Sequence, residues 1–241
     1  PETKDSEFTW KGFQDAVNSE LVAVFGNFVN RSFVLMHKLC GGKVPRLHPE
    51  IMDDTDKAML AEFENTKAEV QSALEYYHFR DGLFQVIELA RKGNQYLQKK
   101  EPWIVARQLE TNPSAQASID NSLHICLQLC ANLAVLINPY LPNTARKMLY
   151  MMKVVEKMLD WENAGKPNLL STGYSLRAPE LLFRKIEDEE ITAQIEKLKS
   201  GLIKSAADNA AAAPNPQKAP MQKPEIQFDD FAKLEMKAAT V

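Results

Sequence analysis

The segment from Asn94 to Arg107 combines residue types that could bind a nucleic-acid base. Pro102 is followed at once by Trp103, with lysines before the pair and Arg107 after it. An aromatic ring offers a face on which a base can stack, and neighbouring cations can hold the phosphates. Because proline suits the first position of a helix, Trp103 is predicted in the first turn of a short helix, near free backbone N–H groups. The alternative is that Trp103 is a core residue beside a turn.

Positive charge is concentrated around the same segment, although the whole chain has a net charge of −3. Residues 91–107 contain five cations against the single carboxylate of Glu101, a local charge of +4 (five minus one): Arg91, Lys92, Lys99, Lys100 and Arg107. Such a cluster predicts an electrostatic footprint for an anionic partner such as RNA. An ordinary solvated helix face is the alternative.

A second polar constellation lies in the first predicted helix. Asn27 and Arg31 are four residues apart, so they share a helix face, next to apolar Phe28 and Leu35. An amide and a guanidinium on one rigid face can recognise a base edge through paired donors and acceptors. The alternative is an Asn–Arg pair that bridges two helices.

Composition and periodicity predict an all-α fold that positions these residues. Glycine is scarce, at nine residues, and helix-forming residues dominate long segments. Apolar spacing and stop signals predict helices at about residues 8–39, 53–77, 80–99, 119–141, 143–152 and 187–204. Residues 119–141 alternate apolar spacings of three and four, which is typical of a helix bundle. Tyr77 and Phe84 are among the residues predicted to be buried.

Composition divides the chain into three parts. Residues 1–204 are predicted to form one helical domain. Residues 205–224 are rich in alanine and proline and predict a flexible linker. Residues 225–241 alternate apolar and charged positions, which predicts a strand. One strand cannot fold alone, so this last part is either the start of a second domain or a segment that docks elsewhere.

Signatures of catalysis and of metal binding are few. The chain has no phosphate-binding loop, nucleophile elbow or dinucleotide-binding motif. Glu75 and His78 match only half of a di-iron motif. Cys126 and Cys130 share a helix face but lack the two further ligands of a zinc site, so they are interpreted as core thiols. Three cysteines favour a reducing, cytoplasmic location, and no apolar run reaches the length of a membrane span.

Taken together, these residues resemble the anticodon-binding region of bacterial-type methionyl-tRNA synthetases. The matching segments, within about residues 8–202, are Phe8–Phe13, Glu20–Arg31, Asn94–Tyr96, Pro102–Arg107, Pro139–Pro142 and Leu182–Glu189. The resemblance implies an all-α helix bundle of the class I synthetase anticodon-binding type. It also implies that Asn27, Arg31 and Trp103 bind the CAU anticodon of methionine tRNA, and we expect Arg107 to contact the RNA beside them.

The resemblance also implies which parts of such an enzyme this chain lacks. The family's two ATP-binding signatures and its cysteine-rich zinc insert are absent, and they belong to a catalytic domain that would precede Pro1. We therefore expect a fragment of a methionine-tRNA ligase that is inactive alone and has no cofactor of its own, ATP and zinc belonging to the catalytic domain. Its expected partners are the anticodon stem-loop of tRNA and that catalytic domain, with no DNA and no membrane. Residues 228–237 resemble the first strand of an OB-fold tRNA-binding domain.

A helical scaffold that binds another protein is the alternative function. Such a scaffold would need an apolar groove. RNA binding requires instead that Asn27, Arg31 and Trp103 converge on one exposed patch, which a folded structure can test.

Overall fold

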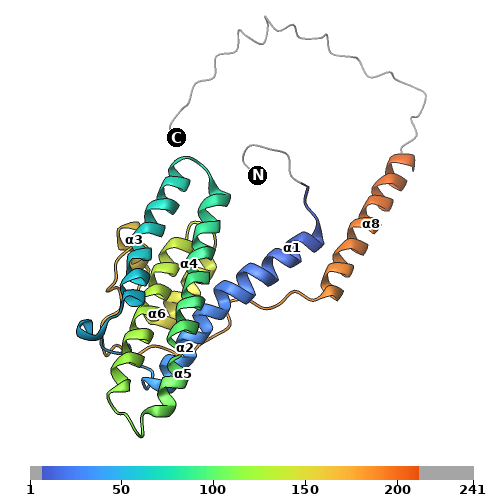
Figure 1. Ribbon diagram of the computed structural model, residues 1–241. Coiled ribbons are helices and arrows are strands. Elements are labelled where there is room, and N and C mark those ends of the chain that lie inside the picture. The colour runs from blue at the N-terminus through green and yellow to red at the C-terminus, as the bar shows by residue number, and fades with distance from the viewer. Residues whose placement is uncertain (1–6, 212–241) are drawn as a thin grey trace, which may run out of the picture. The chain divides into compact units, whose positions relative to one another are not determined.

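The computed structural model describes residues 7–211, and for residues 201–211 it describes the backbone alone. In that part the regular elements are helices, which confirms the all-α prediction (Figure 1). They are α1 Trp10–Ala16, the π-helix η1 Val17–Gly26, α2 Asn27–Leu39, η2 Pro49–Ile51, α3 Asp54–Glu75, α4 Phe79–Lys100, α5 Pro102–Val105, η3 Ala106–Gln108, α6 Ala115–Ile137, α7 Pro142–Met152, η4 Glu156–Leu159, η5 Trp161–Asn163 and α8 Asp188–Ala211. The strand predicted within residues 225–241 lies outside the described residues.

Contacts divide the chain into two units, Pro1–Ile195 and Glu196–Val241. The bundle formed by α1 to α7 belongs to the first unit. Helix α8 continues to Ala211, past its predicted end near Lys204, because alanine has the highest helix propensity and the sequence turns alanine-rich there.

Helix α6 forms the centre of the bundle. Residues 121–137 are all buried, because α6 packs against α2, α3, α4, α5 and α7. Figure 1 shows α6 among α2, α3, α4 and α5. The predicted apolar seam is therefore one part of a surface that is buried all round. By length and composition α6 could cross a membrane, but 94% of its most apolar window is buried inside the protein. It is the core helix of the bundle.

Two aromatic residues that were predicted to be buried are exposed. Tyr77 is 71% exposed and lies with a φ of 60° in the turn between α3 and α4, beyond the end of the apolar stripe. Phe84 is 58% exposed, because it lies outside the buried face of α4, which contains Val86, Leu89 and Leu97. The prediction for Tyr77 was wrong because α3 ends at Glu75, before this residue, and the prediction for Phe84 was wrong because a short apolar pattern fits more than one face of a helix.

One helix type and one helix boundary also depart from the sequence prediction. The helix predicted at residues 8–39 is a continuous helical path, but its middle part, η1, is a π-helix. Helix α6 ends before Pro139, and α7 begins at Pro142, one residue before its predicted start, with Leu141 as its N-cap. Proline at the first helical position accounts for that start, because its fixed φ suits a helix and it needs no hydrogen-bond acceptor.

Candidate nucleic-acid interface

The turn between α4 and α5 determines where Trp103 lies. Glu101 ends α4 in the left-handed conformation, with φ 43° and ψ 52°, and Pro102 is the first residue of α5. The residue before a proline disfavours the right-handed helical region, so the chain changes direction at this position. The carbonyl of Glu101 accepts the N–H groups of Ile104 and Val105, which closes the first turn of α5. Trp103 is thus in the first turn of a short helix, as predicted.

An ion network fixes this turn against the start of α3. Asp53 and Asp56 form a capping box there, and the Nζ atom of Lys100 lies 2.8 Å from Asp53 Oδ2 and 2.6 Å from Asp56 Oδ1. The hydrogen bond from Lys100 is the main reason that the pKa of Asp53 is lowered. The buried hydroxyl of Tyr96 donates to Asp56 Oδ1 at 2.7 Å, and burial raises the pKa of Tyr96. The end of α4 is therefore held in place one residue before the turn.

Arg31 and Trp103 meet across α2 and α5. The guanidinium carbon of Arg31 lies 5.2 Å from the centroid of the Trp103 ring, within the range of a cation–π interaction. Trp103 is partly buried. One part of its side chain packs against the hydrophobic core, and the rest faces Arg31 and solvent. The two interpretations of Trp103, core residue and accessible ring, therefore each describe part of the side chain.

Asn27 extends this arrangement by one turn of α2. It is exposed, and its Nδ2 atom donates to the Oδ1 atom of Asn94 on α4 at 3.3 Å. The side-chain bridge between two helices is thus an Asn–Asn pair, whereas the sequence suggested Asn27 with Arg31. Asn27 and Arg31 remain on one face of α2, and Arg31 contacts Trp103.

Arg107 lines a pocket together with Trp103. This pocket, of about 330 Å³, is lined by Leu35, Lys38, Leu39, Trp103, Ala106 and Arg107. Its lining contains two cations and no carboxylate. We call the region formed by Asn27, Arg31, Lys38, Trp103 and Arg107 the Trp103 surface. Of the four residues predicted as an RNA site, Arg31 contacts Trp103, Arg107 lines the same pocket as Trp103, and Asn27 lies one turn of α2 from Arg31. Lys38 is a further cation that the sequence analysis missed because it is remote in sequence from Trp103.

Three of the five cations in the positive cluster predicted at residues 91–107 are paired with carboxylates, which favours the alternative of an ordinary helix face for that part of the cluster. Arg91 pairs with Glu20 and Glu88, Lys92 with Glu62, and Lys100 with Asp53 and Asp56. Most of these partners come from other helices, so charge counted along the sequence overestimated the field. In contrast, Arg31, Lys38 and Arg107 form no ion pair within residues 7–200. Within the described residues, three cations without an ion pair therefore lie close to Trp103, Arg31 through its ring contact and Lys38 and Arg107 through the shared pocket.

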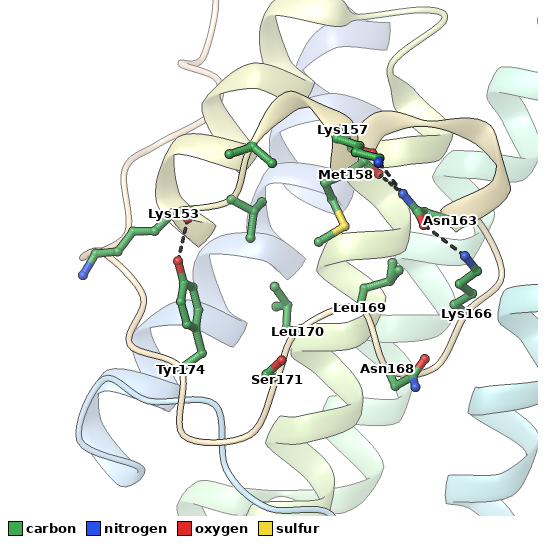
Figure 2. Close-up of a pocket in the computed structure, with 12 residues that line it drawn as sticks. Lys153, Lys157, Met158, Asn163, Lys166, Asn168, Leu169, Leu170, Ser171 and Tyr174 are labelled. Atoms are coloured by element: carbon green, nitrogen blue, oxygen red, sulfur yellow. Dashed lines mark hydrogen bonds between the residues drawn. The ribbon is translucent and has the colours of Figure 1, made fainter.

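A larger pocket, of about 660 Å³, lies beside the irregular segment that follows α7 (Figure 2). Lysines 153, 157 and 166 contribute to its lining, and Leu169 and Leu170 contribute apolar surface. Lys166 donates to Asn163, and the hydroxyl of Tyr174 donates to the carbonyl of Lys153 (Figure 2). None of the predicted site residues lines this pocket.

The described residues contain no group of three or more His, Cys, Asp or Glu side chains that could hold a metal ion. Cys126 and Cys130 are fully buried free thiols, which confirms their interpretation as core residues. Burial raises the pKa of Cys130 to about 12, so this thiol is unreactive at neutral pH. His78, half of the di-iron motif, is exposed at the N-cap of α4.

Comparison with known families gives two matches. Residues 48–201 match the family model described as the anticodon binding domain of methionyl tRNA ligase. Residues 1–33 match the model of class I tRNA synthetases of the methionine type. Trp103 and Arg107 lie within the first matched region, and Asn27 and Arg31 lie within the second.

Curated relatives agree with the family models. Methionine–tRNA ligase of Phocaeicola vulgatus is 44% identical over 241 residues, which is all of this chain and 33% of the relative. The corresponding ligase of Bacteroides fragilis is 43% identical over the same length, again 33% of the relative. This chain thus spans about a third of the length of the curated relatives it matches.

Solved structures show the same fold. The crystal structure of the free state of Mycobacterium tuberculosis methionyl-tRNA synthetase superposes with a TM-score of 0.69 and 21% sequence identity. The match covers 76% of this chain and 36% of that chain. A second structure of that enzyme, in complex with methionyl-adenylate, gives a TM-score of 0.65 over 72% of this chain and 33% of that chain, also at 21% identity.

Proposed function

Because this chain belongs to the methionyl-tRNA ligase family, as its anticodon-binding domain, we propose that it recognises the CAU anticodon of methionine tRNA. The observation that carries the proposal is the contact between the Arg31 guanidinium and the Trp103 ring, one turn of α2 from exposed Asn27. This contact, with Asn27 on the same face of α2 as Arg31, supports the convergence that RNA binding requires. The alternative scaffold function has no comparable observation in its favour.

Each residue of the Trp103 surface has a distinct role in this proposal. The exposed part of Trp103 supplies a stacking face for a base, which gives affinity that tolerates any base. Arg31 and Asn27 supply donors and an acceptor that can distinguish base edges. Lys38 and Arg107 are unpaired cations at the rim, suited to backbone phosphates. The surface thus combines stacking, base recognition and charge neutralisation.

We further propose that the chain acts as part of a longer cytoplasmic ligase. The similarity of residues 1–33 to the class I synthetase model supports contact with a catalytic domain, to which ATP and zinc would belong. This chain alone would bind the anticodon stem-loop, with no membrane or DNA partner and no cofactor of its own, and would not aminoacylate. In the same proposal the linker predicted at 205–224 begins after α8, which ends at Ala211 and not near residue 204, and residues 225–241 are the start of an OB-fold domain.

The proposal is tested by direct binding of RNA stem-loops to the whole chain. A loop with CAU should bind more tightly than the same loop with a changed first anticodon base, and a DNA version should bind more weakly. Affinity should fall with salt, since phosphate contacts release counterions. Equal affinity for the CAU loop and the altered loop would contradict the proposed function.

A further inference from the structure

The helical path that presents Asn27 contains a change of hydrogen-bond register. In the π-helix η1, each N–H reaches five residues back, and the α-helical spacing resumes in α2. At the junction the backbone N–H of Asn27 is directed to the carbonyls of both Val22 and Val24. Such π segments insert extra residues into a turn and frequently occur at functional sites. Here the register change occurs directly before the first residue of the Trp103 surface.

Asn94 of α4 supplies a side-chain donor at this junction. Its Nδ2 atom donates to the carbonyl of Val24 at 3.0 Å and to the carbonyl of Ala90 at 3.2 Å. Both hydrogens of the Asn94 amide are therefore used on backbone carbonyls. A flipped amide would place its oxygen against those two carbonyls, so the orientation of Asn94 is fixed. The Oδ1 atom of Asn94 then accepts from Asn27 Nδ2 at 3.3 Å.

This chain of bonds leaves Asn27 with one preferred orientation. One hydrogen of its amide nitrogen is directed to Asn94, and within the described residues its Oδ1 atom and second hydrogen have no partner. An oriented amide presents one acceptor and one donor in a fixed order. Cytosine and adenine present an amino donor beside a ring-nitrogen acceptor, whereas uracil and guanine present a carbonyl acceptor beside an N–H donor. Rotating the amide by half a turn exchanges one pattern for the other.

We propose that Asn94 is a positioning residue that fixes the amide of Asn27 and thereby determines which base Asn27 selects. The proposal rests on the anticodon-binding function given above. Asn94 does not touch the RNA in this scheme. Its loss leaves Asn27 free to rotate, so Asn27 then accepts either member of a pair of bases that differ by exchange of donor and acceptor.

The scheme predicts a specific pattern of errors. Replacing C by U, A by G or U by C exchanges donor and acceptor at one anticodon position. In Asn94→Ala, discrimination against such an exchange should fall by about tenfold at the position that Asn27 contacts, since one paired donor–acceptor contact is worth about that factor or more. Discrimination at the other two positions should be unchanged. Affinity for the CAU loop should fall less than the discrimination does.

The experiment measures binding of stem-loops with CAU, UAU, CGU and CAC to the whole chain. The variants are Asn94→Ala, Asn94→Leu, which preserves most of the side-chain volume, and Gln95→Ala as the exposed neighbour on α4. Melting temperatures establish that each variant is folded. Gln95→Ala should retain the wild-type ratios of affinity between the CAU loop and each altered loop. Asn94→Leu should lose discrimination at the same anticodon position as Asn94→Ala.

A double-mutant cycle separates positioning from a general structural role. In an Asn27→Ala background, Asn94→Ala should cause no further loss of discrimination, because its effect is transmitted through Asn27. Unchanged ratios in both Asn94 variants, or an equal loss at all three positions, would overturn the proposal. If the wild-type chain itself shows no preference for CAU, the proposed function fails as well, and that measurement is made first.

Discussion

Trp103 illustrates how one side chain can serve both the core and a ligand. Part of the ring packs against the core, and Arg31 lies over it at 5.2 Å. A ring held on one side by packing needs little further ordering when a base stacks on it, because its rotamer is already restricted. The same packing means that removing Trp103 affects stability and binding together.

Trp103→Ala is predicted to weaken binding of the CAU stem-loop by about tenfold to a hundredfold, since stacking is worth roughly 1–3 kcal/mol per base. The melting temperature should fall by only a few degrees, because the ring is partly exposed. Trp103→Phe, which retains a stacking face, should lose less affinity. A large drop in melting temperature with unchanged RNA affinity would show that Trp103 is only a core residue.

Arg31→Lys is predicted to be a severe change although it preserves charge. The planar guanidinium can lie over Trp103 and donate two parallel hydrogen bonds, whereas an ammonium is a point donor. Discrimination at the first anticodon position should therefore fall more than affinity for the CAU loop. Lys38→Ala serves as the comparison, because a phosphate contact should weaken all loops equally. Equal losses in Arg31→Lys would identify Arg31 as a phosphate contact.

At the scale of elements, buried polar side chains of α6 attach irregular segments to the bundle. Gln128 bonds both the N–H and the C=O of Leu170, and Asn132 bonds Gly165 and Lys166. His124 bonds the carbonyl of Pro45 at 2.8 Å. Loops without regular structure leave backbone groups unpaired, and these side chains satisfy them inside the core.

His124 makes stability depend on pH. Burial lowers the pKa of His124 below its ordinary value of 6.5, despite the bond to Pro45. The unfolded chain therefore binds more protons at this site, so the stabilisation is complete above pH 6.5 and is lost as the pH falls through the folded pKa. His124→Gln should reduce the fall in unfolding free energy between pH 7.5 and 5.5. Exposed His78→Gln should retain the wild-type slope, and equal slopes in all three proteins would contradict this role.

Lys99 and Lys100 are adjacent cations with different expected roles. Lys100 lies between Asp53 and buried Asp56, so Lys100→Met should cost about 3 kcal/mol by leaving a carboxylate without its partner. Exposed Lys99→Met should change stability by less than about 0.5 kcal/mol. Urea unfolding measures both values. If both variants instead lose RNA affinity equally and stay equally stable, the residues act as the positive cluster that the sequence suggested.

At the scale of the whole molecule, the core that supports the Trp103 surface lies within residues 25–191. Deleting residues 206–241 is therefore predicted to leave the melting temperature and the affinity for the CAU loop unchanged, because the linker sequence offers little to bury. The measurement is thermal unfolding with and without these residues. A melting temperature several degrees lower would mean that the tail docks on the bundle, with Leu234, Met236 and Ala238 as the expected contact.

The sequence by itself determined the helical class of the fold and the local geometry around Trp103. Periodicity predicted most helices, and Pro102 predicted the start of the short helix that contains Trp103. These features depend on the backbone preferences of adjacent residues, which are local and can be predicted from one sequence. Asn27 and Arg31 could be placed on one face for the same reason.

Only the tertiary structure decided which of these residues meet and which charges are free. Arg31 and Trp103 are far apart in sequence, and their contact depends on how α2 and α5 pack. The ion pair of Lys100 with Asp56 likewise neutralises a charge that the sequence analysis counted as available to RNA. Lys38, which that analysis did not consider, lines a pocket together with Trp103. Contacts between distant segments depend on packing of whole helices, and a local pattern contains no information about the partner that a helix face will have.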